Sequence, residues 1–181
     1  IAKKLKLVQT GAGFDNVDID ACTELGIWVA NAAGVNAQAV AEHVMALILS
    51  YYKNIPFLDA FMKNRLDQNQ LDYTGSELKG KTIGIIGLGA IGKKVATFCK
   101  VFDMNVLAYA RNAAQQSDGF VKMTDFDTLV SASDIVSVHI PLNQQTKQLI
   151  NKVVFKKMKN TTLFINTARG AIVNERDLIN A

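Results

Sequence analysis

Apolar and polar residues follow two different periods along this chain. From residue 82 onwards, short apolar runs typical of buried strands alternate with segments whose apolar residues recur at helical spacing. Strands are predicted at 82–87, 105–110, 134–140 and 162–168, and helices at 91–102, 126–133, 151–158 and 174–181. Isoleucine and valine occupy both parities of these strands, as expected when both faces of a sheet are covered. The alternation predicts an α/β fold with a Rossmann-type, doubly wound parallel sheet built by right-handed crossovers.

The part of the chain before residue 82 carries a shorter version of this pattern. Strands are predicted at 5–10 and 27–32, with a short helix between them that ends at Gly26. Apolar residues then recur at helical spacing over 37–52, and Asn36 is the predicted N-cap of that helix. Pro56 marks the end of this helical region or a kink, and a second helix with a polar connection is expected within 57–78.

Three glycines stand where the first strand of the regular pattern meets its helix. Gly87, Gly89 and Gly92 fit G-x-G-x-x-G, and the motif follows a predicted strand and opens a predicted helix. Gly87 permits the tight turn, Gly89 lets the backbone approach a pyrophosphate, and Gly92 lets the helix pack close to the strand. The helix N-terminus then offers N–H groups and partial positive charge to phosphates. The alternative is a strand–turn–helix corner that binds nothing.

The acid expected about 20 residues past the first glycine is missing. That carboxylate would accept both ribose hydroxyls and repel a 2′-phosphate, but the candidate positions read Ala110, Arg111 and Asn112. Arg111 can form charge-assisted bonds to a phosphate, and Asn112 can donate another hydrogen bond. We therefore predict a cofactor site that prefers NADP(H). The alternative is that Arg111 is an ordinary exposed side chain and the site binds NAD(H).

Two further segments offer groups that recognise a small acid. Arg169 follows the apolar strand in "FINTARG", at the sheet edge where open α/β sheets bind ligands, and its guanidinium can grip a carboxylate. The alternative is a structural ion pair with Glu175 or Asp177. Residues 10–18, "TGAGFDNVD", place glycine backbone after a strand, where N–H groups can form an anion nest or simply a tight turn.

Composition and charge limit the kinds of protein and of binding partner that fit this chain. The chain is 49% apolar and 20% charged, with a net charge of +4 and scattered lysine pairs, so a soluble protein with no nucleic acid or membrane partner is expected.

Cys22 and Cys99 form no CxxC pair and are expected to be buried free thiols in a reducing cytoplasm. His43 is expected to be structural, and His139 to line the cofactor cleft at most. No metal-ligand spacing is present. The chain opens without Met or a signal-peptide pattern and close to a predicted strand, so we expect it to begin within a longer protein.

Several blocks in order make the family recognisable. Among them are "GAGFDNVDIDACTELGIWVAN", "GSELKGKTIGIIGLGAIGKKVA" and "FKKMKNTTLFINTARGAIVNERDLINA". On these residues the chain resembles the D-isomer-specific 2-hydroxyacid dehydrogenases along essentially its whole length. The resemblance implies residues 1–33 as part of a flavodoxin-like substrate domain and 34–181 as the nucleotide-binding domain. It further implies that helix 37–53 helps to form a homodimer, and that the substrate is a small 2-oxo or 2-hydroxy acid.

The same resemblance assigns roles to individual positions. It implies Arg169 as the catalytic arginine, and backbone amides that hold the substrate carboxylate at Ala12 and Gly13. It implies pyrophosphate contacts at Ala90 and Ile91. Positions that line the adenine and nicotinamide ends of the cofactor are implied at Ile140, Pro141, Thr146, Thr167 and Ala168.

The resemblance also sets limits and alternatives. The family's catalytic histidine and its acid partner lie some tens of residues beyond the arginine, past Ala181, so we expect a C-terminally truncated, nearly inactive fragment. The same fold serves a corepressor that binds NAD(H) and partner peptides. Phosphoglycerate, formate and phosphonate dehydrogenases on this scaffold are a further alternative.

Overall fold

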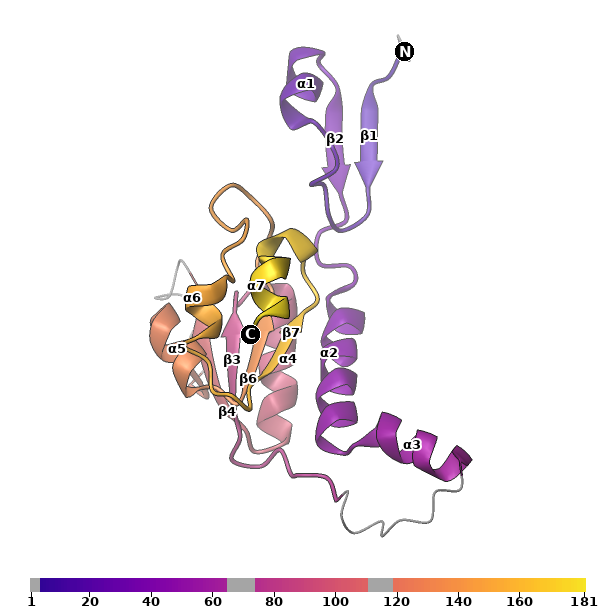
Figure 1. Cartoon of the computed structure of the whole chain (residues 1–181). Helices are drawn as coiled ribbons and strands as arrows, with labels where there is room; N and C mark the ends of the chain where they lie inside the picture. The colour runs from indigo at the N-terminus through magenta and orange to yellow at the C-terminus, as the bar shows by residue number, and fades with distance from the viewer. Residues whose placement is uncertain (1–3, 65–73, 111–118) are drawn as a thin grey trace.

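The computed structural model describes residues 4–64, 74–110 and 119–181 (Figure 1). Arg111 and Asn112 lie outside the described residues, so the predicted phosphate contacts at these two positions stay predictions.

Five parallel strands form the main sheet, in the order β5-β4-β3-β6-β7. Their bounds are β3 Thr82–Ile86, β4 Asn105–Tyr109, β5 Val121–Met123, β6 Ile135–Val138 and β7 Leu163–Asn166. The chain leaves β3 first towards β4 and β5, and then crosses back to β6 and β7 on the other side. This reversal between β3 and β6 opens a crevice at the carboxyl ends of the strands, where doubly wound folds bind ligands. The predicted parallel α/β sheet is confirmed.

Helices cover both faces of this sheet (Figure 1). On one face, α2 (Ala37–Tyr52) and α4 (Ala90–Val101) pack on Ile83 and Ile85 of β3. On the other face, α5 (Phe126–Ala132) and α6 (Lys152–Phe155) pack with Ile86 in a second apolar cluster. Successive side chains of β3 point alternately into the two apolar clusters, which explains why apolar residues occupy both odd-numbered and even-numbered positions of this strand.

The N-terminal residues form a separate unit. The strands β1 (Leu7–Thr10) and β2 (Trp28–Asn31) pair in parallel as a two-stranded sheet, and α1 (Ile19–Glu24) connects them. The carboxylate of Asp18 accepts a 2.9 Å hydrogen bond from Ala21 N and caps α1. Figure 1 shows this unit standing beyond the end of the main sheet, joined to it by the segment that leads into α2.

Local details differ from the sequence prediction in three places. Asn36 does precede α2, but its backbone (φ −97°, ψ 9°) is not extended as an N-cap requires, and its side chain makes no cap hydrogen bond. The predicted helix 151–158 is helical only over Lys152–Phe155, because the chain turns after Phe155 towards β7. The strand β5 was not predicted, since it has three residues and shows no usable period.

Two other predictions before residue 82 also need adjustment. Pro56 interrupts no helix: α2 ends at Tyr52, and α3 (Ile55–Asn64) begins with Pro56 in its first turn, where a missing N–H costs nothing. His43 is exposed on α2 and does not lie among its buried apolar residues. The chain closes with the 3₁₀ turn η3 (Gly170–Ile172) and α7 (Glu175–Ile179).

Candidate cofactor and substrate site

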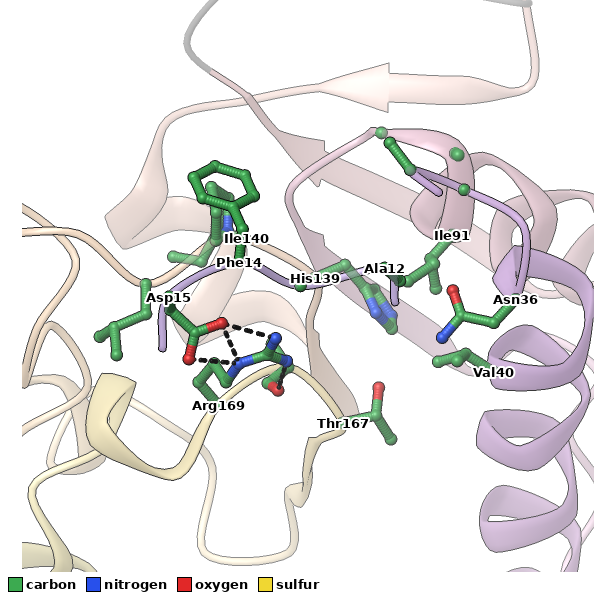
Figure 2. A pocket seen from close by; sticks show the side chains of 18 residues that line it. Ala12, Phe14, Asp15, Asn36, Val40, Ile91, His139, Ile140, Thr167 and Arg169 are labelled. Atoms are coloured by element: carbon green, nitrogen blue, oxygen red, sulfur yellow. Dashed lines mark hydrogen bonds and ion pairs between the residues drawn. The ribbon is translucent and has the colours of Figure 1, made fainter. Parts of the chain in front are cut away.

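A pocket of about 320 Å³ lies at the carboxyl ends of β3, β6 and β7, where the N-terminal unit meets the main sheet (Figure 2). Five segments of the chain supply its walls. The residues that line it are Ala12, Gly13, Phe14, Asp15, Ala33, Gly34, Asn36, Val40, Gly89, Ala90, Ile91, His139, Ile140, Pro141, Leu142, Thr167, Ala168 and Arg169. The glycine motif and Arg169 therefore border one pocket, although some eighty positions separate them in sequence.

The glycine corner has the close packing that its sequence predicts. Gly87 has a φ of 102°, and a Cβ on it would lie 2.7 Å from the carbonyl oxygen of His139. A Cβ on Gly92 would overlap the carbonyl oxygen of Gly87, so only glycine lets α4 start this close to β3. A Cβ on Gly89, by contrast, would meet nothing within 4 Å, because this residue faces the pocket. Space is thus kept free in front of the N-terminus of α4.

Two buried polar atoms in the pocket wall lack a hydrogen-bond partner in the described part of the chain. They are Nδ1 of His139 and Oγ1 of Thr167, which follow β6 and β7. Nε2 of His139 lies 2.9 Å from Oγ of the fully buried Ser137. Burial lowers the pKa of His139 to about 4, so its ring is neutral at physiological pH. Buried polar groups are normally paired, so these two atoms point to a polar ligand in the pocket.

Arg169 enters the pocket from the end of β7 and meets a carboxylate from the other side. Its Nη2 lies 2.7 Å from Oδ1 of Asp15, and its Nε donates to both oxygens of that carboxylate at 2.9 and 3.0 Å (Figure 2). Its Nη1 donates to the carbonyl oxygen of Ala168 at 2.9 Å. The hydrogen bond to Arg169 is the main cause that lowers the pKa of Asp15. The alternative partners considered for Arg169, Glu175 and Asp177, are wrong.

The glycine turn after β1 packs directly against this guanidinium. A Cβ on Gly13 would overlap Nη2 of Arg169. The carbonyl oxygen of Ala12 accepts a 3.0 Å hydrogen bond from Nδ2 of Asn31, which ties the turn to β2. The turn and the guanidinium therefore form one local arrangement at the edge of the pocket.

Comparison with known proteins identifies the family. A model of the NAD binding domain of the D-isomer specific 2-hydroxyacid dehydrogenases matches residues 45–181. The chain belongs to this family.

Individual members show how much of a whole protein the chain represents. It is 44% identical to D-3-phosphoglycerate dehydrogenase of Archaeoglobus fulgidus, over 99% of this chain and 34% of the relative. D-lactate dehydrogenase of Aquifex aeolicus, in complex with NAD and lactic acid, superimposes with a TM-score of 0.90 at 33% identity, over 98% of this chain and 54% of that one. An acyclic imino acid reductase in complex with NADPH and D-Arg gives 0.89 at 31% identity, over 98% and 57%. The chain thus spans about a third to just over half the length of these family members.

Most residues that the sequence predicted for this dehydrogenase family site do meet in the pocket. Those that line it are Ala12, Gly13, Gly89, Ala90, Ile91, Ile140, Pro141, Thr167, Ala168 and Arg169. Gly87 and Gly92 shape the corner behind the wall. Thr146 does not reach the pocket: it is buried, its hydroxyl donates to the carbonyl oxygen of Pro141 at 2.7 Å, and it thereby fixes the loop after β6. His139 lines the pocket as predicted.

Sequence reasoning missed Asp15 and the apolar neighbours Phe14, Val40 and Leu142 as pocket residues. Asn36 also lines the pocket, which agrees with its failure to cap α2. Asp15 could have been noticed as the acid nearer the glycines of the two in "GAGFDNVD", but nothing in that motif identifies its partner.

Other classes of site find no support in the described residues. No group of three or more His, Cys, Asp or Glu side chains that could hold a metal ion occurs in residues 4–64, 74–110 and 119–181. Over the same ranges, no helix has the length and apolarity needed to cross a membrane. The free thiols are as predicted for Cys99, which is buried, but Cys22 is only partly buried.

Proposed function

We propose that the pocket binds a nicotinamide cofactor beside a small 2-oxo acid, and that the protein reduces such an acid reversibly to a D-2-hydroxy acid. One observation carries this proposal: the glycine corner and Arg169 border the same pocket. Family membership supports it, because the matched family consists of NAD-binding 2-hydroxyacid dehydrogenases.

The described residues fit the cofactor. The open space in front of Gly89 accommodates a pyrophosphate, and the free amides of Ala90 and Ile91 at the start of α4 are available to bind it. Ile140 supplies an apolar wall, and the unpartnered Thr167 hydroxyl offers a hydrogen bond to a polar edge of the ligand. When bound, the cofactor supplies a hydride for the carbonyl carbon of the substrate.

The substrate end of the pocket contains the groups that a 2-oxo acid requires. Arg169 and the amides of the Ala12–Gly13 turn hold the carboxylate, and the guanidinium polarises the neighbouring carbonyl. Neither histidine of the sequence stands at the position of the family's catalytic histidine. We therefore propose that the proton donor lies outside this sequence and that the chain alone turns over substrate at most very slowly. Lack of NADPH oxidation at 340 nm with glyoxylate, hydroxypyruvate or pyruvate tests this; brisk turnover overturns it.

We further propose that the cofactor is NADP(H) rather than NAD(H). Ala110 directly follows β4, and Tyr109 accepts a 2.9 Å hydrogen bond from Gly87 N, so the position of the usual acid does lie beside the glycine corner. With alanine there, a 2′-phosphate meets no negative charge, and Arg111 follows it in sequence. Solved structures similar to this chain include one in complex with NAD and one in complex with NADPH, so both cofactors are candidates.

Fluorescence titration of the chain with NADH and NADPH tests the cofactor proposal. NADPH should bind about tenfold or more tightly than NADH, and Arg111→Ala should remove most of that advantage by deleting a charge-assisted contact. Arg176→Ala, an exposed arginine on α7, is the matched control and should leave the ratio unchanged. Equal affinities in the unmodified chain overturn the NADP(H) preference, and binding of neither nucleotide overturns the cofactor site itself.

A homodimer through α2 is a separate proposal. Leu47 and Tyr51 of this helix are 40% and 54% exposed, and they border an apolar hollow with Phe57 and Phe164. Light scattering after size exclusion should give twice the monomer mass, and Leu47→Glu with Tyr51→Glu should halve it. A monomeric unmodified chain contradicts the dimer proposal but leaves the proposals for the cofactor and substrate pocket unaffected.

A further inference from the structure

Asp15 lines the pocket and forms an ion pair with Arg169, but the proposed reaction assigns it no role. We propose that Asp15 is an internal competitor of the substrate: its carboxylate occupies Arg169 in the unliganded chain, and the carboxylate of an incoming acid must displace it. The inference rests on the proposed function, since it concerns the same guanidinium.

The first support is the geometry of the pair. Asp15 takes the side edge of the guanidinium through three contacts of 2.7 to 3.0 Å, which is the two-point grip expected for a substrate carboxylate. Asp15 thus occupies the same guanidinium edge that a bound acid would use.

The second support is steric. Gly13 lies against Nη2 of Arg169 so closely that no side chain fits between them. Nη1 is engaged by the carbonyl oxygen of Ala168. With Asp15 on the remaining edge, a second carboxylate meets a guanidinium whose charge is neutralised and whose flanks are covered. Binding therefore requires that Asp15 leaves.

The third support is that the pair is exchangeable. The side chains of Arg169 and Asp15 are 42% and 38% exposed, so water and ions reach both partners. Exposed ion pairs are weak and reversible, unlike buried ones. Because Asp15 is tethered, however, it competes at an effective concentration of about millimolar. A simple acid must exceed that concentration, whereas a 2-oxo acid can use its carbonyl and the pocket walls to displace Asp15.

The pair also joins two parts of the molecule. Among the residues that the structure describes, it is the only ion pair between the N-terminal unit (residues 4–33) and the rest of the chain. When a ligand displaces Asp15, the ion pair that directly connects these two parts is lost, and the parts are then connected through the ligand.

The test measures binding of oxamate, a non-reacting analogue of a 2-oxo acid, by NMR titration of the whole chain at pH 7. Asp15→Asn should bind oxamate about tenfold more tightly than the unmodified chain, because the competitor loses its charge. Asp18→Asn is the control: it removes the same charge from the same segment, while asparagine still caps α1. It should leave the affinity unchanged, and Arg169→Gln should abolish binding in either background.

A measurement on the unmodified chain keeps the test independent of how the variants fold. Saturation with oxamate should shift the ¹³Cγ signal of Asp15 and the Nε–H signal of Arg169 together, as the pair opens. Oxamate binding that leaves the Asp15 signal in place, or equal or weaker binding by a folded Asp15→Asn, overturns the inference alone. Failure of oxamate to bind the unmodified chain and Asp15→Asn refutes the proposed substrate class, and the inference with it.

Discussion

The Cα of Gly92 faces the carbonyl oxygen of Gly87 so closely that a Cβ at position 92 would overlap it. Gly89, between them, faces open space in the pocket. One short motif thus contains a glycine needed for packing and a glycine that keeps room for a ligand, and the two roles can be separated by experiment.

Gly92→Ala should destabilise the chain, because the added methyl group forces the start of α4 away from β3. Overpacking of this kind costs about 1–3 kcal/mol in the free energy of unfolding, which urea denaturation measures. Unchanged stability would show that α4 can shift freely, contrary to its contacts with both β3 and α2.

Gly89→Ala should leave the free energy of unfolding within about 0.5 kcal/mol of the unmodified value, since the methyl group meets no protein atom. It should nevertheless weaken nicotinamide nucleotide binding about tenfold or more, because the methyl group fills the space proposed for the pyrophosphate. Fluorescence titration measures this loss. A variant that binds nucleotide normally would place the pyrophosphate elsewhere.

The fold was predictable because its signals are local. Strands such as β3 and β6 are short apolar runs, and helices such as α2 show their period over many residues, so element order and the parallel sheet follow from the sequence. The meeting of the glycine corner with Arg169 was predictable for a related reason: both follow parallel strands, and the carboxyl ends of such strands share one edge.

What the sequence could not supply are contacts between distant, exposed side chains. Asp15 and Arg169 are 154 positions apart, and several other acids could equally have been the partner. The failed cap at Asn36 has a similar origin, because backbone angles set by the crossing between β2 and α2 override its intrinsic preference. The shortest strand, β5, forms because β4 offers it a pairing edge, which no local period records.

His139 should make the stability of the chain depend on pH. Its pKa is lowered by burial from 6.5 to about 4, so the unfolded state binds the proton more tightly than the folded state. The stabilising contribution of the neutral ring is therefore complete above about pH 6.5 and is lost as the pH falls towards 4. The loss amounts to at most about 3 kcal/mol, at 1.36 kcal/mol per pKa unit.

Urea denaturation between pH 4 and 7 measures this effect. His139→Gln should flatten that part of the profile, whereas His43→Gln, at an exposed position on α2, should leave the slope as it is. A slope that survives in His139→Gln would show that burial of this ring is not the source of the acid sensitivity. Asp134 does not contribute in this range: burial alone would raise its pKa, but hydrogen bonds from Lys159 and from Thr82 N outweigh that effect and lower the pKa below its usual 3.8, so its contribution is lost only below about pH 4.

The two thiols should differ in reactivity. Cys99 is fully buried in the core beneath α4, and burial raises the pKa of its thiol to about 12, so neither access nor ionisation favours reaction. Cys22 on α1 is only partly buried. A disulfide reagent such as DTNB should titrate one thiol in the native chain and two in denaturant. Cys22→Ser should abolish the native reaction; a native titre of two would mean that the α4 core opens readily.

Ala110→Asp should reverse the proposed cofactor preference. Ala110 directly follows β4 beside the glycine corner, so an aspartate there can accept the ribose hydroxyls of NADH and repel the 2′-phosphate of NADPH. We expect NADPH to bind about tenfold more weakly and NADH to gain, by fluorescence titration of both nucleotides. Val153→Asp is the charge-matched control, because Val153 is exposed in the first turn of α6, where an acid is tolerated. If Ala110→Asp weakens both nucleotides equally, residue 110 contacts something other than the ribose, and the preference must be set by other residues.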